Sequence, residues 1–255
     1  MSDSKRVVIT GGSEGIGLAL GKLLASEGHQ IVLAARREPQ LLEAAAGCGP
    51  NAIGIVTDVR DRAAVESLRD QTLARLGAID VWVNNAGRGI GKRVLELTEA
   101  DFDEMMSVNV KSALFGMQAI IPYFQSRGHG HLLNVSSFLG RVPLAPHRSA
   151  YSAAKAALNS LTANLRMDLR STHPNVRVSL VMPGMVTTDF SKNALGGTPA
   201  VPPPQGPIQP QTAEQVAEAI SELIRNPVPE RFTNPLQVDV ARRYCTDVAA
   251  FEAQL

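Results

Sequence analysis

Short apolar runs alternate with helix-like segments along the chain, and this alternation restricts the fold more than any other feature of the sequence. The apolar runs are rich in β-branched residues, which is typical of strands buried on both faces of a parallel sheet. They lie at residues 6–10, 30–35, 52–57, 79–84, 131–136 and 176–182. The helix-like segments lie near 15–27, 38–47, 60–76, 98–126, 150–171 and 212–225. This order predicts an α/β fold with a doubly wound, mostly parallel sheet in a three-layer α/β/α arrangement.

No linker or internal repeat divides the 255 residues, so we expect a single domain over residues 1–255. A content of 44% apolar and 19% charged residues is typical of a globular protein. Residues 196–210 interrupt the alternation, because six prolines between 199 and 210 exclude a helix interior or a central strand. This long loop is either a lid over a site or a plain surface excursion.

Charge and cysteine content exclude several classes of protein. The chain has 25 basic and 24 acidic residues, a balance that argues against binding nucleic acid or an anionic membrane surface. Cys48 and Cys245 lack the spacing of a metal site or a disulfide framework, so we expect no metal. The sequence shows neither an apolar run of membrane-spanning length nor a signal peptide, which predicts a cytoplasmic protein.

A glycine-rich turn follows the first predicted strand and begins the first predicted helix. Residues 10–17 read TGGSEGIG. A pyrophosphate binds backbone N–H groups at a helix N-terminus, where side chains must be absent. Gly11 would permit the tight turn, Gly15 the close approach of the ligand, and Gly17 the packing of the helix on the sheet. The position in the first strand-to-helix turn predicts a Rossmann-type dinucleotide site, although glycines also serve simple turns.

The end of the second predicted strand indicates which dinucleotide is bound. An NAD site usually places an acidic residue about 20 residues beyond the glycines, but position 35 is alanine and Arg36 and Arg37 follow. Two guanidinium groups suit a ribose 2′-phosphate, which favours NADP(H) over NAD(H). A solvated arginine pair is the alternative, and Glu14 would repel a phosphate if its side chain faced that way.

Further motifs occur in order, each at a predicted strand end or the following helix. They are Asn84-Asn85-Ala86-Gly87, Asn109, Asn134-Val135-Ser136-Ser137, Tyr151-Ser152-Ala153-Ala154-Lys155 and Pro183-Gly184. Together with TGGSEGIG, they make residues 5 to about 190 resemble the compact single-domain branch of the short-chain dehydrogenase/reductase family. The combination is specific, whereas each motif alone is weak: a tyrosine and a lysine one turn apart occur on many helices, and serine and asparagine at such positions are usually caps.

The resemblance implies a catalytic role for four residues. Tyr151 would be the acid/base, Ser137 would bind the substrate oxygen, Lys155 would bind the nicotinamide ribose, and Asn109 would hold a water in a proton relay. Cofactor contacts are implied for Gly11, Ser13, Glu14, Gly15, Ile16, Gly17, Arg36, Arg37, Asp58, Val59, Asn85, Ala86, Gly87, Tyr151, Lys155, Pro183, Gly184, Val186 and Thr188. The substrate would meet residues around Leu139, Val142, Leu144, Met185 and Arg88, a mostly apolar set that suggests a hydrophobic ketone.

The spacing of Tyr151 and Lys155 gives this chemistry a physical basis. Residues four apart on a helix share one face. A free tyrosine has a pKa near 10 and is a poor base at neutral pH. The lysine ammonium and an oxidised nicotinamide would each favour the phenolate. Lowering the pKa by about three units requires roughly 4 kcal/mol, which two close charges in a dry cleft can supply.

Two departures from the family pattern concern the substrate loop and the C-terminus. The family serine commonly lies thirteen residues before the tyrosine, but here that position is Phe138, so we infer a one-residue insertion within 141–149 and keep Ser136 as a second candidate. The helix-like residues 240–255 replace the ending that many members use in tetramers. We therefore expect a homodimer through the helices at 109–126 and 150–171, with a tetramer as the alternative.

The sequence thus predicts an NADP(H)-dependent enzyme that interconverts a ketone or aldehyde with an alcohol. A catalytically silent NADP-binding sensor or scaffold is the first alternative, although such a protein would not need the acid/base residues. A sugar-nucleotide epimerase or dehydratase is the second alternative. Those enzymes are longer chains with an additional substrate domain, and this chain is too short to contain one. The segment at about 185–211, which contains the proline-rich residues 196–210, follows Pro183-Gly184 and is expected to be a lid over the substrate.

Overall fold

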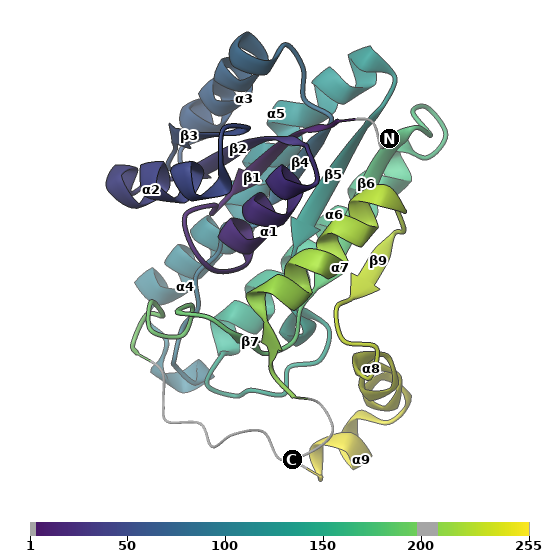
Figure 1. Cartoon of the computed structure of the whole chain (residues 1–255). Helices are drawn as coiled ribbons and strands as arrows, with labels where there is room; N and C mark the ends of the chain where they lie inside the picture. Colours follow the sequence, from purple (N-terminus) through teal and green to yellow (C-terminus); the bar gives the residue numbers. More distant parts are fainter. Residues whose placement is uncertain (1–3, 198–208, 255) are drawn as a thin grey trace.

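A seven-stranded parallel sheet forms the centre of the molecule (Figure 1). The computed structural model describes residues 4–197 and 209–254, so most of the proline-rich segment lies outside the described residues. The strand order is β3 (Ala52–Val56), β2 (Gln30–Ala35), β1 (Arg6–Thr10), β4 (Val81–Asn84), β5 (Gly130–Val135), β6 (Val176–Met182) and β9 (Glu230–Phe232). The order reverses direction beside β1, which creates the crevice where doubly wound folds bind ligands.

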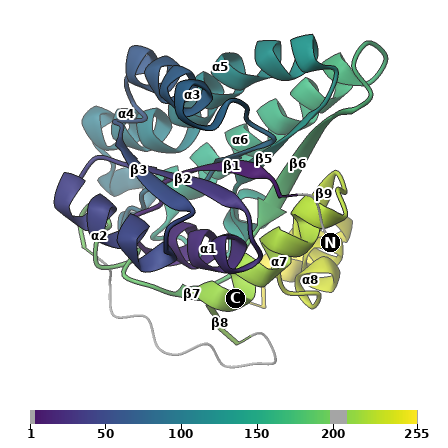
Figure 2. The same ribbon diagram turned by 45° about the horizontal axis from the view of Figure 1, so that its top comes forward.

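Helices cover both faces of the sheet (Figure 2). One layer contains α1 (Gly15–Ser26), α2 (Glu38–Cys48) and α7 (Ala213–Arg225). The other contains α3 (Arg62–Leu76), α5 (Ser112–Arg127) and α6 (Ser149–Leu169). The predicted single-domain, three-layer Rossmann-type fold is therefore confirmed, and six of the seven strands lie where the apolar runs predict them.

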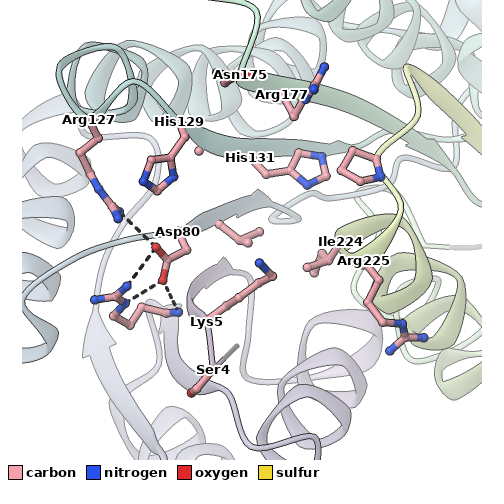
Figure 3. A pocket seen from close by; sticks show the side chains of 14 residues that line it. Ser4, Lys5, Asp80, Arg127, His129, His131, Asn175, Arg177, Ile224 and Arg225 are labelled. Atoms are coloured by element: carbon pink, nitrogen blue, oxygen red, sulfur yellow. Dashed lines mark hydrogen bonds and ion pairs between the residues drawn. The ribbon is translucent and has the colours of Figure 1, made fainter. Parts of the chain in front are cut away.

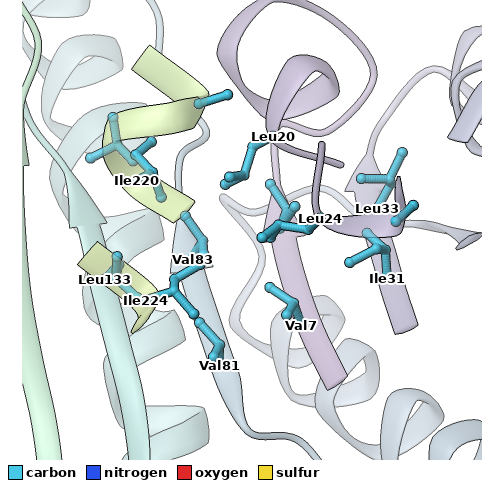
Figure 4. Packing of buried hydrophobic residues seen from close by; sticks show 14 of the residues in the cluster. Val7, Leu20, Leu24, Ile31, Leu33, Val81, Val83, Leu133, Ile220 and Ile224 are labelled. Carbon is cyan, nitrogen blue, oxygen red and sulfur yellow. The ribbon is translucent and has the colours of Figure 1, made fainter. Parts of the chain in front are cut away.

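Alternate residues of each strand supply the two halves of the core. Val7 and Val81 face the layer of α1 and α7. There they belong to one apolar cluster with Leu24 of α1 and Ile220 of α7, as Figure 4 shows. Their strand neighbours face the opposite layer, where Trp82 is fully buried. Because both faces of these strands are covered, the runs are apolar throughout and do not alternate with polar residues.

The long helical region after β4 differs from the expected element. The expected helix at 98–126 is divided into α4 (Glu99–Met106) and α5 by a π-helical turn at Ser107–Lys111. The C-terminal residues form α8 (Gln237–Thr246) and α9 (Val248–Glu252), which pack against Phe138 and Val142. A short parallel pair, β7 (Val186–Thr187) and β8 (Gln211–Thr212), joins the chain after β6 to the chain before α7. No helix in the described part of the chain is long and apolar enough to cross a membrane.

Candidate active site

The glycine-rich turn lies at the carboxyl end of β1, and its conformation depends on backbone angles that glycine adopts easily. Gly11 and Gly15 have φ angles of 65° and 55°, values that side-chain-bearing residues rarely adopt. The amide of Asn85 donates to the carbonyl oxygens of Thr10 and Gly11 at 3.0 and 3.2 Å, which fixes the turn against the end of β4. The turn therefore keeps its shape through the chain's own hydrogen bonds.

This turn fits the pyrophosphate of a dinucleotide. A Cβ atom on Gly17 would overlap the Gly11 carbonyl oxygen and lie 2.7 Å from the Asn85 amide, so only glycine is accommodated there. Glu14 is the N-cap residue of α1, and within the described structure its side chain makes no capping hydrogen bond. The first backbone N–H groups of α1 are thus available to an anion. Ser13 is half-buried in the turn, and Ile16 packs against the core beneath it.

The region after β2 and β3, where the adenosine is expected to lie, is rich in ion pairs. Arg37 binds Glu14 at 2.7 Å, so the Glu14 carboxylate faces the proposed phosphate site and is neutralised there. Arg36 is exposed, and its charge contributes to lowering the pKa of Asp58. That lowering comes mainly from Arg60, which binds the Asp58 carboxylate at 2.7 Å. The neighbouring side chain of Val59 is buried.

The end of β4 brings the cofactor turn and the catalytic residues together. The backbone N–H groups of Asn85 and Ala86 donate to the Thr10 hydroxyl. Gly87 follows, and a Cβ there would lie 2.9 Å from Asn109 Oδ1 and 3.5 Å from Lys155 Nζ. Any side chain at position 87 would fill the space between Asn109 and Lys155. Gly87, Asn109 and Lys155 therefore lie next to one another.

Asn109 lies in the π-helical turn. Its Nδ2 donates to the carbonyl oxygens of Arg88 and Met105 at 2.9 and 3.1 Å, and its Oδ1 accepts the Arg88 N–H at 3.2 Å. A π-turn inside a helix is costly and is frequently found at functional sites. Here it directs a buried amide towards the loop after β4, on the side where Lys155 lies.

Tyr151 and Lys155 lie one turn apart on α6, and both are buried. The Lys155 ammonium donates to the Val135 carbonyl oxygen at 2.9 Å and lies 5.7 Å from the Tyr151 ring centre. Burial raises the pKa of Tyr151 to about 12, against a smaller lowering by the Ser137 hydroxyl and the Arg148 charge. Burial also lowers the pKa of Lys155 to about 8. Without a bound ligand, desolvation thus outweighs the expected lowering of the tyrosine pKa.

The geometry distinguishes the two serine candidates. Ser136 donates towards the Asn159 side chain and the Lys155 carbonyl oxygen, so its hydroxyl faces the interior of α6. Ser137 accepts the Leu139 N–H at 3.1 Å, and its hydroxyl, through a side-chain hydrogen bond, is the larger of the two influences that lower the pKa of Tyr151. Ser137 is therefore the serine that faces the tyrosine.

The expected substrate residues separate into different environments. Leu139 packs with Tyr151 beside the site. Val142 is fully buried, and Leu144 packs with it against α8 and α9, so these two residues support the loop from behind. Met185 is 53% exposed just beyond β6. The loop at 141–149 is therefore anchored by the C-terminal helices.

The chain after β6 turns back towards the glycine-rich turn. The Pro183 carbonyl oxygen accepts the Phe138 N–H at 2.8 Å, and Gly184 lies against the buried Gln237 side chain. Val186 pairs with β8, and Thr188 then faces Gly15 across the cofactor turn. The residues expected to frame the nicotinamide thus lie next to those expected to hold the pyrophosphate.

Three residues at this site escape the motif-based prediction. Phe190 packs edge-on against Tyr151, with ring centres 5.6 Å apart. Asn159 links Ser136 to the Gly140 carbonyl oxygen. Arg148, three residues before the tyrosine, is buried with its guanidinium beside the site. Of these three residues, Arg148 could have been found from the sequence, because it lies one helical turn before the expected catalytic Tyr151.

A hollow of about 450 Å³ lies at the opposite edge of the sheet, where β1, β4, β5 and β6 begin (Figure 3). Lys5 and Arg177 line it, and Asp80 forms ion pairs there with Arg6 and Arg127. None of the residues predicted to form the active site lines this hollow. The described residues include no group of three histidine, cysteine or acidic side chains that could hold a metal ion.

Comparison with known proteins identifies the family. The model of the short chain dehydrogenase family matches residues 5–196. The chain belongs to this family. An uncharacterized oxidoreductase of Staphylococcus epidermidis is 33% identical over 188 residues, which are 74% of this chain and 80% of the relative. This chain is an NAD(P)-dependent short-chain dehydrogenase/reductase.

Solved structures of the family agree with the fold. A short-chain dehydrogenase/reductase from Burkholderia phymatum in complex with NAD is 28% identical, with a TM-score of 0.85 over 97% of this chain and 95% of that one. An alcohol dehydrogenase from Thermococcus sibiricus complexed with 5-hydroxy-NADP is 31% identical, with a TM-score of 0.78 over 90% of this chain and 96% of that one. A nicotinamide cofactor is therefore supported, and the neighbours include both forms.

Proposed function

We propose that this short-chain dehydrogenase/reductase interconverts a ketone or aldehyde with an alcohol, with NADP(H) as the preferred cofactor. The observation that carries the proposal is the convergence of Tyr151, Ser137, Lys155 and Asn109 beside the glycine-rich turn. A protein that only bound the nucleotide would have no use for a buried tyrosine faced by a serine hydroxyl.

In the reductive direction, the Tyr151 hydroxyl donates its proton to the carbonyl oxygen of the substrate. A nicotinamide held beside the glycine-rich turn would supply the hydride for reduction and would accept it in the oxidative direction. Ser137 donates a hydrogen bond to the same oxygen and stabilises its developing negative charge. The raised pKa of Tyr151, about 12, means that the phenol carries its proton at neutral pH before a ligand binds.

Lys155 assists from one helical turn beyond the tyrosine, with its ammonium 5.7 Å from the Tyr151 ring centre. Its ammonium is anchored at the Val135 carbonyl oxygen, close to the volume that Gly87 leaves open. Its pKa of about 8 leaves it mostly cationic at neutral pH, and this charge stabilises the phenolate that remains after proton donation. Asn109 fixes the loop after β4, and we assign it the placement of a relay water.

The choice of NADP(H) rests on the arginine pair after β2. Arg36 is exposed beside Asp58 and free to turn towards a 2′-phosphate. Arg37 would have to exchange the Glu14 carboxylate for that phosphate, which lowers its contribution. A charge-assisted bond from Arg36 therefore supports the preference.

We also propose a homodimer, formed through α5 and α6, which sedimentation velocity at micromolar concentration would detect. Many family members form tetramers through a different C-terminal ending, whereas α8 and α9 of this chain pack on its own loop at 138–144.

The test of the function is NADPH consumption with a panel of ketones, aldehydes, diketones and oxo acids. The proposal predicts turnover of at least one member and a higher kcat/KM with NADPH than with NADH. NADPH binding without consumption by any carbonyl would instead support a silent nucleotide-binding protein.

A further inference from the structure

Arg148 is a buried cation without a partner of opposite charge in the described part of the chain. Arg148 is the residue immediately before α6, and it is only 8% exposed. The guanidinium donates to the Ile90 carbonyl oxygen at 3.2 Å and to the Ser191 hydroxyl at 3.1 Å, and both acceptors are neutral. By contrast, Arg6, Arg60 and Arg141 each bind a carboxylate directly.

The surroundings of Arg148 leave it with unused hydrogen-bonding capacity. A guanidinium has five N–H donors, and the two bonds above use only two of them. The Nε–H has no acceptor among residues 4–197 and 209–254, yet the atom is not sealed from solvent. Burying a cation without an anion costs several kcal/mol. A ligand carboxylate would remove that cost and use the free donors.

The guanidinium lies close to the aromatic ring that packs on Tyr151. Arg148 and Tyr151 are three residues apart at the start of α6, which places them on one side of the helix. A Cβ on Gly89 would lie 2.7 Å from Arg148 Nη1 and 2.9 Å from the Phe190 ring, and that ring packs on Tyr151. The charges of Arg148 and Tyr151 also act on each other, because each shifts the pKa of the other. The Phe190 ring thus lies between the Arg148 guanidinium and the Tyr151 phenol and contacts the phenol ring.

We propose that Arg148 is a carboxylate-binding subsite and that the substrates are oxo acids and the corresponding hydroxy acids. The inference rests on the proposed function and narrows its substrate class. The carboxylate binds the Arg148 guanidinium while the carbonyl oxygen lies between Tyr151 and Ser137. One turn of helix separates the two groups, so a short acid with its carbonyl close to the carboxylate fits best.

The closest competing explanation is a clamp without a ligand. The bonds of Arg148 to Ile90 and Ser191 join the loop after β4 to the segment after β7, which alone would stabilise the site. A clamp would affect every substrate equally, whereas a subsite would affect only anionic substrates. Matched substrates of different charge therefore separate the two roles.

The experiment measures kcat/KM for acetoacetate and for acetoacetamide, its neutral analogue of similar size. The wild-type chain should prefer acetoacetate by at least ten-fold. Arg148→Gln should lose about 100-fold in kcat/KM on acetoacetate, mainly through KM, and less than about three-fold on acetoacetamide. Arg148→Lys should recover part of the loss, because it retains the charge without the planar fork.

Arg93→Gln is the matched control, since it removes an exposed arginine from the same loop region and should leave both substrates unchanged. Thermal unfolding of each variant shows whether it is folded. Equal losses on the acid and the amide in Arg148→Gln would overturn the subsite in favour of the clamp. Wild-type turnover of acetoacetamide without a preference for the acid would overturn the subsite alone, whereas no turnover of any carbonyl in the panel would overturn the proposed function with it.

Discussion

At the residue scale, the cofactor preference depends on how two adjacent arginines are already engaged. Arg37 is held by Glu14, and the pair is half exposed on both sides, so solvent screens it. Arg36 makes no such pair within the described residues and influences Asp58 only through its charge. A 2′-phosphate therefore gains more from Arg36, because no existing ion pair has to break.

Arg36→Ala should weaken NADPH binding by about 10- to 100-fold, the value of a hydrogen bond between charged groups, and change NADH binding less than two-fold. Arg37→Ala should have a smaller effect. The measurement is the Kd of each cofactor by fluorescence titration, with the exposed Arg170→Ala as a control. Equal losses for NADPH and NADH would refute the phosphate assignment.

At the element scale, periodicity predicts the central strands and principal helices but misses changes of helix type. Residues 98–126 carry a continuous helical pattern, and the π-turn at Ser107–Lys111 alters the hydrogen bonds without altering that pattern. β9 has three residues and follows two prolines, too little for an alternating or continuous apolar run. The motif residues at strand ends are predictable because parallel strands bring their carboxyl ends to one edge.

Side-chain roles at the site are less predictable than their positions. Val142 and Leu144 belong to an apolar loop near the tyrosine, but only the structure shows that α8 and α9 cover them. Arg148 and Phe190 belong to no motif, and their contacts depend on how three segments meet. Such contacts arise between residues far apart in sequence, which local pattern does not encode.

Gly17→Ala tests the first turn of α1 as a phosphate cradle. The new Cβ would meet the Gly11 carbonyl oxygen and the Asn85 amide, so the turn must shift. We expect at least a ten-fold higher Kd for NADPH and a loss of about 1–3 kcal/mol in stability. Gly47→Ala is the matched control, because only the flexible Lys22 side chain lies near it, at 3.8 Å. Similar NADPH affinities in the two variants would contradict the cradle.

At the scale of the whole molecule, the two edges of the sheet have opposite character. The carboxyl edge carries the candidate active site, while the amino edge carries the hollow with its basic side chains (Figure 3). His131 is buried at that edge, bound to Ser179 at 2.9 Å, with its Nδ1 unpartnered in the described structure. Burial, with the charges of Lys5 and Arg177, lowers the pKa of His131 to about 3.

We expect this shift to make the fold less stable in acid. Between about pH 6.5 and 3 the unfolded chain binds a proton at His131 that the folded chain does not, so stability falls as the pH falls. His131→Gln removes the titration and should reduce the loss by up to about 1.4 kcal/mol per pH unit. Urea unfolding at pH 7 and 5 measures the difference, with the exposed His129→Gln as a control. Parallel losses in wild type and His131→Gln would contradict this account.

The central claim is that Tyr151 is the proton donor of a carbonyl reduction, and Tyr151→Phe tests it most directly. The variant keeps the ring that packs on Phe190 and removes only the hydroxyl that Ser137 faces. The measurement is kcat on the carbonyl that the wild type reduces fastest, together with the Kd for NADPH. We predict a fall in kcat of about 10²- to 10⁴-fold with a nearly unchanged Kd. A variant that retains wild-type turnover would contradict the mechanism.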